Sequence, residues 1–583
     1  MDFFRKVLAS CLGTTLAIIL ITFLGFFLLG IVASSVGDTD KITVTGNSVL
    51  EINLGDAVND YTPKSDSPFD KLFEVDQYQL SQIINAIENA KNDDDIKGIS
   101  ILNLTVNAGI SQTQTIRDKL VDFKTTGKFI TAYADFYTQK NYYLSSVADS
   151  IYVTPYGGVD FKGLSSERLF YKDFQEKYGV KMEVIRHGKY KSAVEGYLEN
   201  EMSAANREQI SSFLNSIWSE LVEDIAISRN KTVEELNLIA DDLLTRNATM
   251  AIENNMLDGA IYKDQYEEIL NTFVGDEANI VSLEDYIETG KGRIKSSASN
   301  KIAVLYAQGD ILYGKGDETY IGQESMIKAI RKIRDNDKIK AVVLRVNSPG
   351  GVALTADLIW RELEILKKEK PLVVSMGNLA ASGGYYIACN ADVIYAEPTT
   401  ITGSIGVFGT IPNFSELAGN MGINAEQVAT HKNSIGYSAF EPMTKDFYDV
   451  TKEGVEQIYT TFVNRVAEGR DMTFDEVDAV AQGRVWTGKE ALEIGLVDVL
   501  GNMNDAVEAA AELAEITDYK TTNYPRYKKD FEDSFKGFPF MNVKEKLLKE
   551  ELGEENYKAL KQVKKMSQLK GLQMRLPYDI DIR

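Results

Sequence analysis

The chain has 583 residues, of which 44% are hydrophobic and 26% are charged. This is the composition of a folded protein, and the length is too great for one hydrophobic core, so we expect about two to four domains. The formal net charge of −23 argues against a nucleic-acid partner, because a phosphate backbone would be repelled. Only two cysteines and two histidines occur, with no Cys-x-x-Cys or HExxH motif, so the sequence predicts no disulfide framework, no obligatory metal and no other cofactor.

The N-terminus predicts a short cytoplasmic tip and one transmembrane anchor within residues 1–37. Arg5 and Lys6 precede a run over 7–37 that contains no charged residue. A membrane span needs about 20 residues, whereas a cleavable signal segment has an apolar run of only ~7–15. The run therefore favours an anchor over a signal peptide. The two basic residues predict that the chain from Asp38 onward lies outside the cytoplasm.

A tandem duplication is the clearest pattern in the rest of the chain. A constant shift of 243 positions aligns residues 96–189 with residues 339–432 without a gap, and Ala-Asp-Ser-Ile-Tyr at 148–152 falls on Ala-Asp-Val-Ile-Tyr at 391–395. General α/β patterning does not explain such agreement, so self-similarity at a fixed period predicts two structural repeats. We place the first repeat at 38–295, the second at 296–520 and a C-terminal helical extension at 521–583.

The alternation of segments in the second repeat predicts an α/β fold with a mostly parallel sheet. Apolar runs rich in β-branched residues predict buried strands at 301–306, 339–346, 371–375 and 393–396. Amphipathic or small-residue runs predict helices at 324–334, at 355–368 and from about Ser382. The first repeat follows the same plan from about Asp76.

Three other segments connect or extend the repeats. Residues 290–300 are typical of a linker, and residues 501–518 of a closing helix. Residues 543–572 carry apolar side chains at helical spacing, which is typical of a helix at an interface or of one lying on a membrane surface. Glutamates near this stripe weaken the second interpretation.

Lys191 is the first candidate for chemistry, in the stretch Lys-Tyr-Lys-Ser-Ala-Val-Glu at 189–195. The ordinary interpretation is a lysine on the surface. A lysine can act as a base only if burial or positive neighbours lower its pKa from about 10.4 toward neutrality. The sequence alone does not show such burial, so both interpretations stay open at this point.

A glycine turn follows one of the predicted strands directly, with Asn-Ser-Pro-Gly-Gly at 347–351. Glycines at such a strand end let backbone N–H groups approach an oxyanion closely. An ordinary Pro-Gly turn has the same composition. The turn is therefore a candidate oxyanion site only in combination with a nucleophile.

Ser382 is the candidate nucleophile, in Ala-Ala-Ser-Gly-Gly-Tyr at 380–385. A serine at the start of a helix can also be an N-cap. A cap requires no pair of alanines and pair of glycines beside it, whereas a nucleophile that accepts a peptide carbonyl requires that space. The N–H of Gly383 would then help to hold the oxyanion.

The duplication relates these candidates to one another. Under the shift of 243, Ser382 aligns with Gln139, the glycine turn aligns with Asn-Ala, and Lys191 aligns with Ser434. Each repeat holds what the other lacks, which predicts one composite site in which Lys191 meets Ser382 across an interface. Whether the two repeats belong to one chain or to neighbouring subunits stays open.

These features together resemble the signal peptide peptidase A (protease IV) family in its long, two-repeat, membrane-anchored form. The resemblance is carried by the anchor, the duplication and the motifs at 348–351, 381–385 and 190–195. Arg-Val-Trp-Thr-Gly at 484–488, followed by Gly-Leu-Val-Asp at 495–498, is similar to the C-terminal signature of that family. The similarity runs from about Ile42 to Asp505.

The resemblance implies tandem ClpP/crotonase-like α/β domains and a serine endopeptidase with a Ser-Lys dyad. It implies that the enzyme degrades cleaved signal peptides and other apolar peptides on the periplasmic side of a bacterial inner membrane, as a homo-oligomer that is a tetramer by family resemblance. Membrane lipid would be contacted through the N-terminal helix. By resemblance, Ser382 is the nucleophile, Lys191 the general base, and the amides of Gly351 and Gly383 the oxyanion donors.

Residues Gly403, Ser404, Ile405 and Gly406 are a candidate substrate-binding strand, with a glycine-rich turn as the equal alternative. The sequence leaves two rival functions beside the peptidase. A crotonase-type acyl-CoA enzyme would not need Ser382, and its cytoplasmic cofactor would not reach an exported site. A pseudoprotease that only scaffolds membrane partners would not need the intact serine and lysine.

Overall fold

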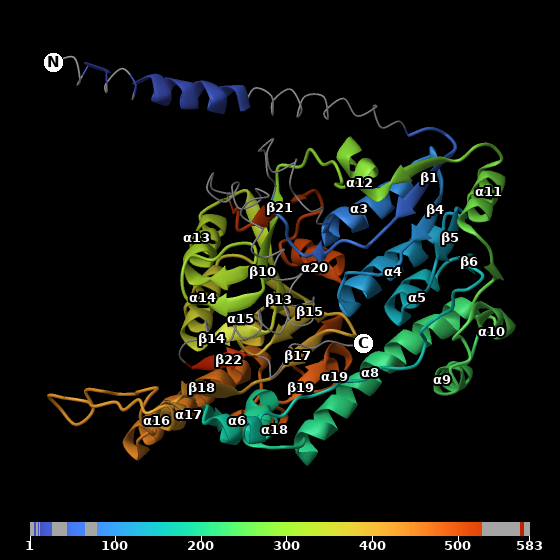
Figure 1. Ribbon diagram of the computed structural model, residues 1–583. Helices are drawn as coiled ribbons and strands as arrows, with labels where there is room; N and C mark the ends of the chain where they lie inside the picture. Colours follow the sequence, from blue (N-terminus) through green and yellow to red (C-terminus); the bar gives the residue numbers. More distant parts are fainter. Residues whose placement is uncertain are drawn as a thin grey trace.

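The computed structural model describes residues 5–6, 10, 12–25, 44–63, 78–527 and 572–575. Residues 12–25 form a helix that extends away from the body of the molecule (Figure 1). Residues 26–37 and several earlier positions of the predicted anchor lie outside the described part. Within the described residues, no helix combines the length and apolar character that crossing a membrane requires. The anchor therefore stays a prediction.

The first repeat is built on a six-stranded sheet in which all neighbouring strands are parallel. The strand order is β8-β6-β5-β4-β1-β9. In chain order the strands are β1 (Ser48–Ile52), β4 (Ile96–Leu102), β5 (Phe129–Ala134), β6 (Ser150–Val153), β8 (Gly259–Ala260) and β9 (Asn279–Ser282). Helices cover its faces, so that the strands are buried on both sides, as in other parallel sheets (Figure 1).

The second repeat has an eight-stranded sheet that lies beside the first (Figure 1). The main strand order is β19-β17-β15-β13-β10-β21. Strand β16 also pairs with β15, and β20 pairs with β16. All of the pairs are parallel except β17 with β19. The strands are β10 (Lys301–Gln308), β13 (Ile339–Ser348), β15 (Leu372–Ala381), β16 (Val393–Ala396), β17 (Ile401–Gly403), β19 (Val485–Thr487), β20 (Val499–Leu500) and β21 (Lys520–Tyr524).

The predicted α/β plan with parallel sheets is confirmed, with one correction. The strand predicted at 371–375 does not end there, because β15 continues to Ala381, immediately before Ser382. Gly377 and Asn378 interrupt the apolar pattern that marked the strand in the sequence. Pairing with β13 and then with β17 keeps the backbone extended across this interruption.

Corresponding helices of the two repeats lie at the same spacing in the chain. The pairs α3 (Leu80–Lys91) with α13 (Gln323–Arg334), and α4 (Ile110–Lys124) with α14 (Ala353–Lys367), begin and end 243 positions apart. In α13 the buried residues recur at the spacing of one helix face, and three basic residues lie in the last turn, where they offset the helix dipole. The duplication predicted from the sequence is therefore a structural one.

A third, six-stranded sheet joins the repeats. Strand β7 (Lys181–His187) of the first repeat pairs antiparallel with β18 (Val407–Asn413) of the second, from His187 opposite Val407 to Lys181 opposite Asn413. The full order is β12-β11-β14-β22-β18-β7, with β11 (Asp310–Leu312), β12 (Tyr320–Gly322), β14 (Gly350–Val352) and β22 (Gln573–Arg575). The pairing carries the chain that follows β7 into the second repeat of the same molecule.

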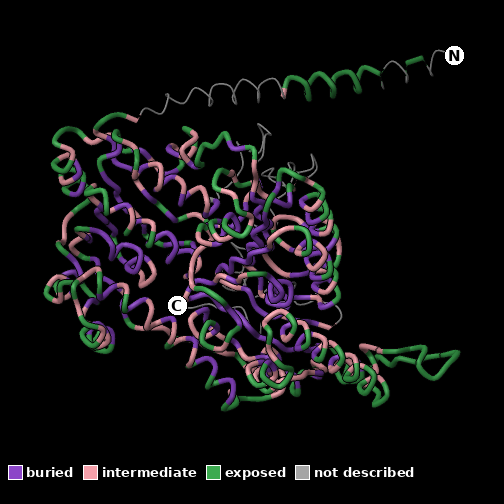
Figure 2. The backbone as a smooth tube through the Cα atoms, turned by 180° about the vertical axis from the view of Figure 1, so that it is seen from behind, coloured by how far each residue is buried: buried purple, intermediate pink, exposed green. Residues whose placement is uncertain are grey.

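Burial follows this arrangement. Buried backbone runs through both sheets, whereas the connection between α16 (Ser415–Asn420) and α17 (Lys445–Arg470) is an exposed arm (Figure 2). Within the predicted C-terminal helical extension, the described residues include most of β21 and the strand β22. The helix predicted at 543–572 lies outside the described residues up to Leu572.

Candidate active site

Ser382 stands at a sharp turn between a strand and a helix. Strand β15 ends at Ala381 and helix α15 (Gly383–Ala388) begins directly after the serine. Its backbone has φ 56° and ψ −116°, a region that residues with a side chain rarely adopt. Such strain persists only where the surrounding structure enforces it, and it is often associated with function. Ser382 occupies the N-cap position of α15, but its side chain makes no capping hydrogen bond.

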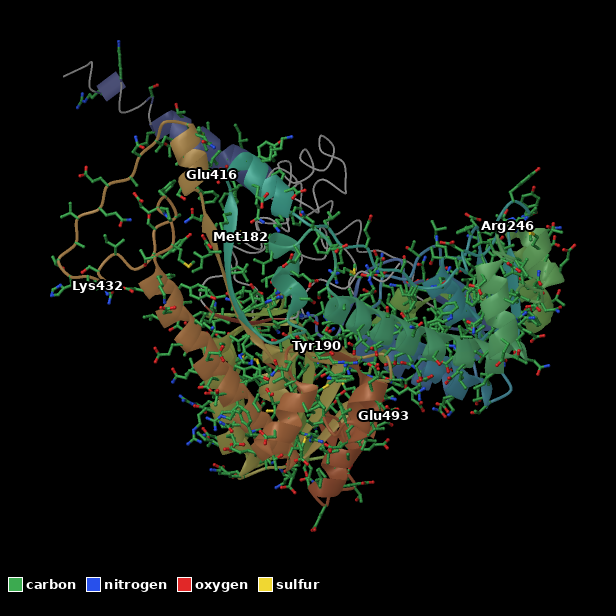
Figure 3. The ribbon with its side chains drawn as sticks, turned by 90° about the horizontal axis from the view of Figure 1, so that it is seen from below. Met182, Tyr190, Arg246, Glu416, Lys432 and Glu493 are labelled. Atoms are coloured by element: carbon green, nitrogen blue, oxygen red, sulfur yellow. The ribbon has the colours of Figure 1, made fainter. Side chains whose placement is uncertain are left out.

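Lys191 reaches this serine from the first repeat of the same chain. After β7, the backbone turns so that the N–H of Tyr190 donates to the carbonyl of Gln482, and Arg186 donates to the carbonyl of Lys191. Figure 3 shows Tyr190 where the first repeat meets the second. The Nζ atom of Lys191 lies 3.0 Å from Ser382 Oγ. Two side chains that are 191 positions apart in sequence thus meet within one protomer.

Ser404 completes the surroundings of the amine. Lys191 Nζ lies 2.9 Å from Ser404 Oγ and 3.0 Å from the Ser404 carbonyl oxygen. The hydroxyl of Ser404 can in turn donate to the carbonyl of Gly483 at 3.4 Å. A neutral amine donates its two N–H groups to these oxygens and keeps its lone pair for the hydroxyl proton of Ser382. This geometry suits an amine that acts as a base.

The electrostatic setting favours the neutral amine. Lys191 is 0% exposed, and burial lowers its pKa well below the usual range of a lysine. In the described part of the chain, no carboxylate forms an ion pair with it. Glu195, the acidic residue nearest in sequence, is also buried, but it accepts hydrogen bonds from the Ser203 amide and from Asn206. The positive charge of the protonated form therefore lacks compensation.

Two glycines leave room for the stem of the lysine. A Cβ atom added at Gly483, where φ is +80°, would lie 2.7 Å from Lys191 Cβ, and one added at Gly406 would lie 3.2 Å from Lys191 Cδ. Gly483 thus packs directly against Lys191, and the carbonyl of Gln482 holds the preceding residue, Tyr190. Neither Gln482 nor Gly483 was predicted from the sequence as part of the site, although both immediately precede the motif at 484–488.

The predicted oxyanion donors also come together. A Cβ atom added at Gly350 would lie only 2.6 Å from the amide nitrogen of Gly383, and one added at Gly383 would lie 3.2 Å from that of Gly351. The two amides therefore flank one small space beside Ser382. Gly350 has φ +93°, which only glycine adopts without strain. Backbone amides arranged in this way can stabilise a tetrahedral oxyanion.

The segment predicted to bind substrate contacts both Ser382 and Lys191. Gly403 ends β17, and its carbonyl accepts a hydrogen bond from the amide of Ser382 at 2.8 Å. Ser404 contacts the amine as described, and Ile405 belongs to the core of the second repeat. These contacts hold Ser382 and Lys191 in place. Direct substrate binding by residues 403–406 stays a prediction.

The two histidines take no part in this arrangement. His187 lies 2.6 Å from Glu456 and stacks on Tyr459, and His431 lies on the exposed arm. The described contacts of both rings exclude Ser382, so the geometry is not that of a Ser-His-Asp triad. Within the described residues, no group of three or more His, Cys, Asp or Glu side chains could hold a metal ion.

Comparison with known proteins agrees with the geometry. Peptidase family S49 matches the chain twice, at residues 122–272 and 364–517. Protease 4 of Haemophilus influenzae is 35% identical over 517 residues, which is 85% of this chain and 84% of the relative. Serine protease SPPA, chloroplastic, of Arabidopsis thaliana is 31% identical over 75% of this chain and 66% of its own length. The putative signal peptide peptidase SppA of Enterococcus faecium is 33% identical over 42% of this chain and 73% of its own length.

The fold and these relatives together define a serine-type peptidase with mixed α/β architecture. More particularly, the chain belongs to peptidase family S49, in the form that carries two copies of the family's domain. The resemblance described from the motifs is thereby confirmed.

Proposed function

We propose that this protein is a membrane-anchored serine endopeptidase in which Ser382 is the nucleophile and Lys191 the general base. Its substrates are cleaved signal peptides and other apolar peptides. The observation that carries the proposal is the 3.0 Å distance between Lys191 Nζ and Ser382 Oγ, in surroundings that lower the pKa of the amine. The name of the Enterococcus faecium relative supports the substrate class.

The reaction is an acyl transfer in two halves. Ser382 Oγ attacks the carbonyl carbon of the peptide while Lys191 Nζ takes its proton, and the amides of Gly351 and Gly383 stabilise the oxyanion. The resulting ammonium of Lys191, held by Ser404, gives the proton to the leaving amine. Lys191 then takes a proton from water, which attacks the acyl-enzyme and releases the second product.

Membrane attachment and assembly belong to the same proposal. Residues 1–37 anchor the chain in a bacterial inner membrane, with the catalytic body on the periplasmic side, and the protein forms a homo-oligomer. Exposed apolar side chains along the arm between α16 and α17 support an assembly, because such patches mark interaction surfaces. More than half of each of these side chains is exposed: Met421, Ile423, Val428 and Phe440.

A fluorophosphonate probe tests the assignment of the nucleophile. We expect the probe to form an adduct at Ser382, located by peptide mass spectrometry. The adduct should be absent from Ser382→Ala and should form at least about 100-fold more slowly in Lys191→Ala, because the base is lost. Lys189→Ala is the matched control, since Lys189 is exposed and lies two positions away. Equal labelling of Lys191→Ala and Lys189→Ala would rule out the proposed base.

A further inference from the structure

Gln482 connects the turn that carries Lys191 to the second repeat. Its carbonyl accepts a hydrogen bond from the amide of Tyr190 at 2.8 Å, and Tyr190 directly precedes the lysine. The next residue, Gly483, packs against the lysine stem, and its amide donates to the carbonyl of Ile405 at 2.8 Å. The position of Lys191 therefore depends on the backbone at 482 and 483.

The backbone of Gln482 has a conformation that its surroundings must enforce. Its φ is +54°, in the left-handed region that residues with a side chain seldom adopt. The chain reaches this conformation two positions after helix α18 (Phe474–Val480) ends. Such strain persists only where neighbouring groups hold it, and it is common at functional sites. Without that hold, the residue would relax and its carbonyl would turn away from Tyr190.

The side-chain amide of Gln482 supplies the hold. Its Nε2 atom donates to Asp478 Oδ1 at 2.7 Å and to the hydroxyl oxygen of Tyr459 at 3.0 Å, so that both of its N–H groups have partners. The hydroxyl of Tyr459, in α17, donates in turn to the same oxygen of Asp478. The ring of Tyr459 is 3% exposed and stacks on His187, the last residue of β7. The amide thus joins α17 and α18 to the end of the strand that leads to Lys191.

We propose that Gln482 is a positioning residue for the general base, Lys191. The inference rests on the proposed function. Asp478 and Tyr459 fix the side chain of Gln482, and this side chain fixes the backbone that holds the turn before the lysine. The amine is thereby kept within reach of Ser382 and shielded from water.

Two effects distinguish positioning from a general contribution to folding. A displaced base lowers kcat, because proton transfer in the transition state depends on geometry, while KM changes little. Water that enters beside a displaced amine weakens the effect of burial, so the pKa of Lys191 rises toward its usual value and the rising limb of the pH–rate profile moves to higher pH. A variant that only destabilises the fold changes neither quantity per folded molecule.

The experiment measures kcat, KM and the midpoint of the pH–rate profile for full-length variants with an apolar peptide. Gln482→Leu has a similar volume but no amide. We expect its kcat to fall about 10- to 100-fold, with KM within about twofold of the wild-type value and the midpoint about 0.5 pH unit or more higher. Gln457→Leu makes the same change at an exposed position of α17 and is the matched control.

A second pair of variants tests the partner of the amide. Asp478→Leu removes the acceptor and should reproduce the effects of Gln482→Leu. Asp478→Asn keeps an acceptor oxygen and should restore most of the kcat and the wild-type midpoint. If circular dichroism shows that Gln482→Leu does not fold, this pair decides in the same way.

The outcomes separate this inference from the proposed function. Folded Gln482→Leu and Asp478→Leu proteins with the wild-type kcat would overturn the positioning role alone. A lower kcat with an unchanged midpoint would also overturn it, because the amine would then keep its surroundings. Folded wild-type protein that does not hydrolyse the peptide would instead remove the proposed function, and this inference with it.

Discussion

Arginine in place of Lys191 should lower kcat/KM for peptide hydrolysis by about 10²- to 10⁴-fold, the usual contribution of a general base. A guanidinium keeps its charge at any accessible pH and cannot accept the proton of Ser382. Initial rates with an apolar peptide measure the effect.

Lys189→Arg is the control for this experiment, because it makes the same change at an exposed position of the same turn. Circular dichroism of both variants establishes that they are folded. If Lys191→Arg, once shown to be folded, retained more than a tenth of the wild-type kcat/KM, Lys191 could not be the base.

Alanine in place of Asp60 should lower the free energy of unfolding by about 3–5 kcal/mol, the usual cost of removing one partner of a buried ion pair. Asp60 lies 2.9 Å from Arg345 in β13, and their side chains are 2% and 1% exposed. Asp60 also accepts a hydrogen bond from Asn347 at 2.6 Å. The variant would leave a buried guanidinium without its counter-charge. Urea unfolding followed by fluorescence measures the change.

Two further variants make the interpretation of this result specific. Asp56→Ala changes a more exposed aspartate of the same segment and should alter the free energy of unfolding by less than about 0.5 kcal/mol. The double variant Asp60→Leu with Arg345→Met should regain most of the loss, since apolar replacement of a whole buried pair is often neutral. If Asp60→Ala and Asp56→Ala changed the free energy of unfolding equally, the buried ion pair would not contribute to stability as we expect.

Much of the architecture could be predicted because the sequence contains two copies of the same domain. The constant shift of 243 positions identified elements that the structure repeats with the same bounds, such as α4 and α14. The same comparison showed that Ser382 and Lys191 each lack a counterpart in the other repeat. Because each repeat lacks the residue that the other holds, the contact between Ser382 and Lys191 could be predicted without any structural distance.

What could not be predicted depends on contacts between distant parts of the chain. The pairing of β7 with β18 has no local signal, yet it delivers Lys191 to the second repeat. The burial that lowers the pKa of this lysine comes from neighbours such as Gly406 and Gly483, far away in sequence. Strand β22 is too short for a periodic pattern, and its extended form depends on β14 and β18 on either side.

The pH dependence of Ser382 acylation by a fluorophosphonate tests most directly whether a buried, uncharged amine activates this hydroxyl. Below the pKa of the amine, a proton occupies the lone pair, so the rate must rise with pH and level off once the amine is neutral. Because burial lowers this pKa, we predict a midpoint well below the 10.5 of an ordinary lysine. A midpoint at or above 10.5, or the same rising limb in the residual labelling of Lys191→Ala, would contradict the mechanism.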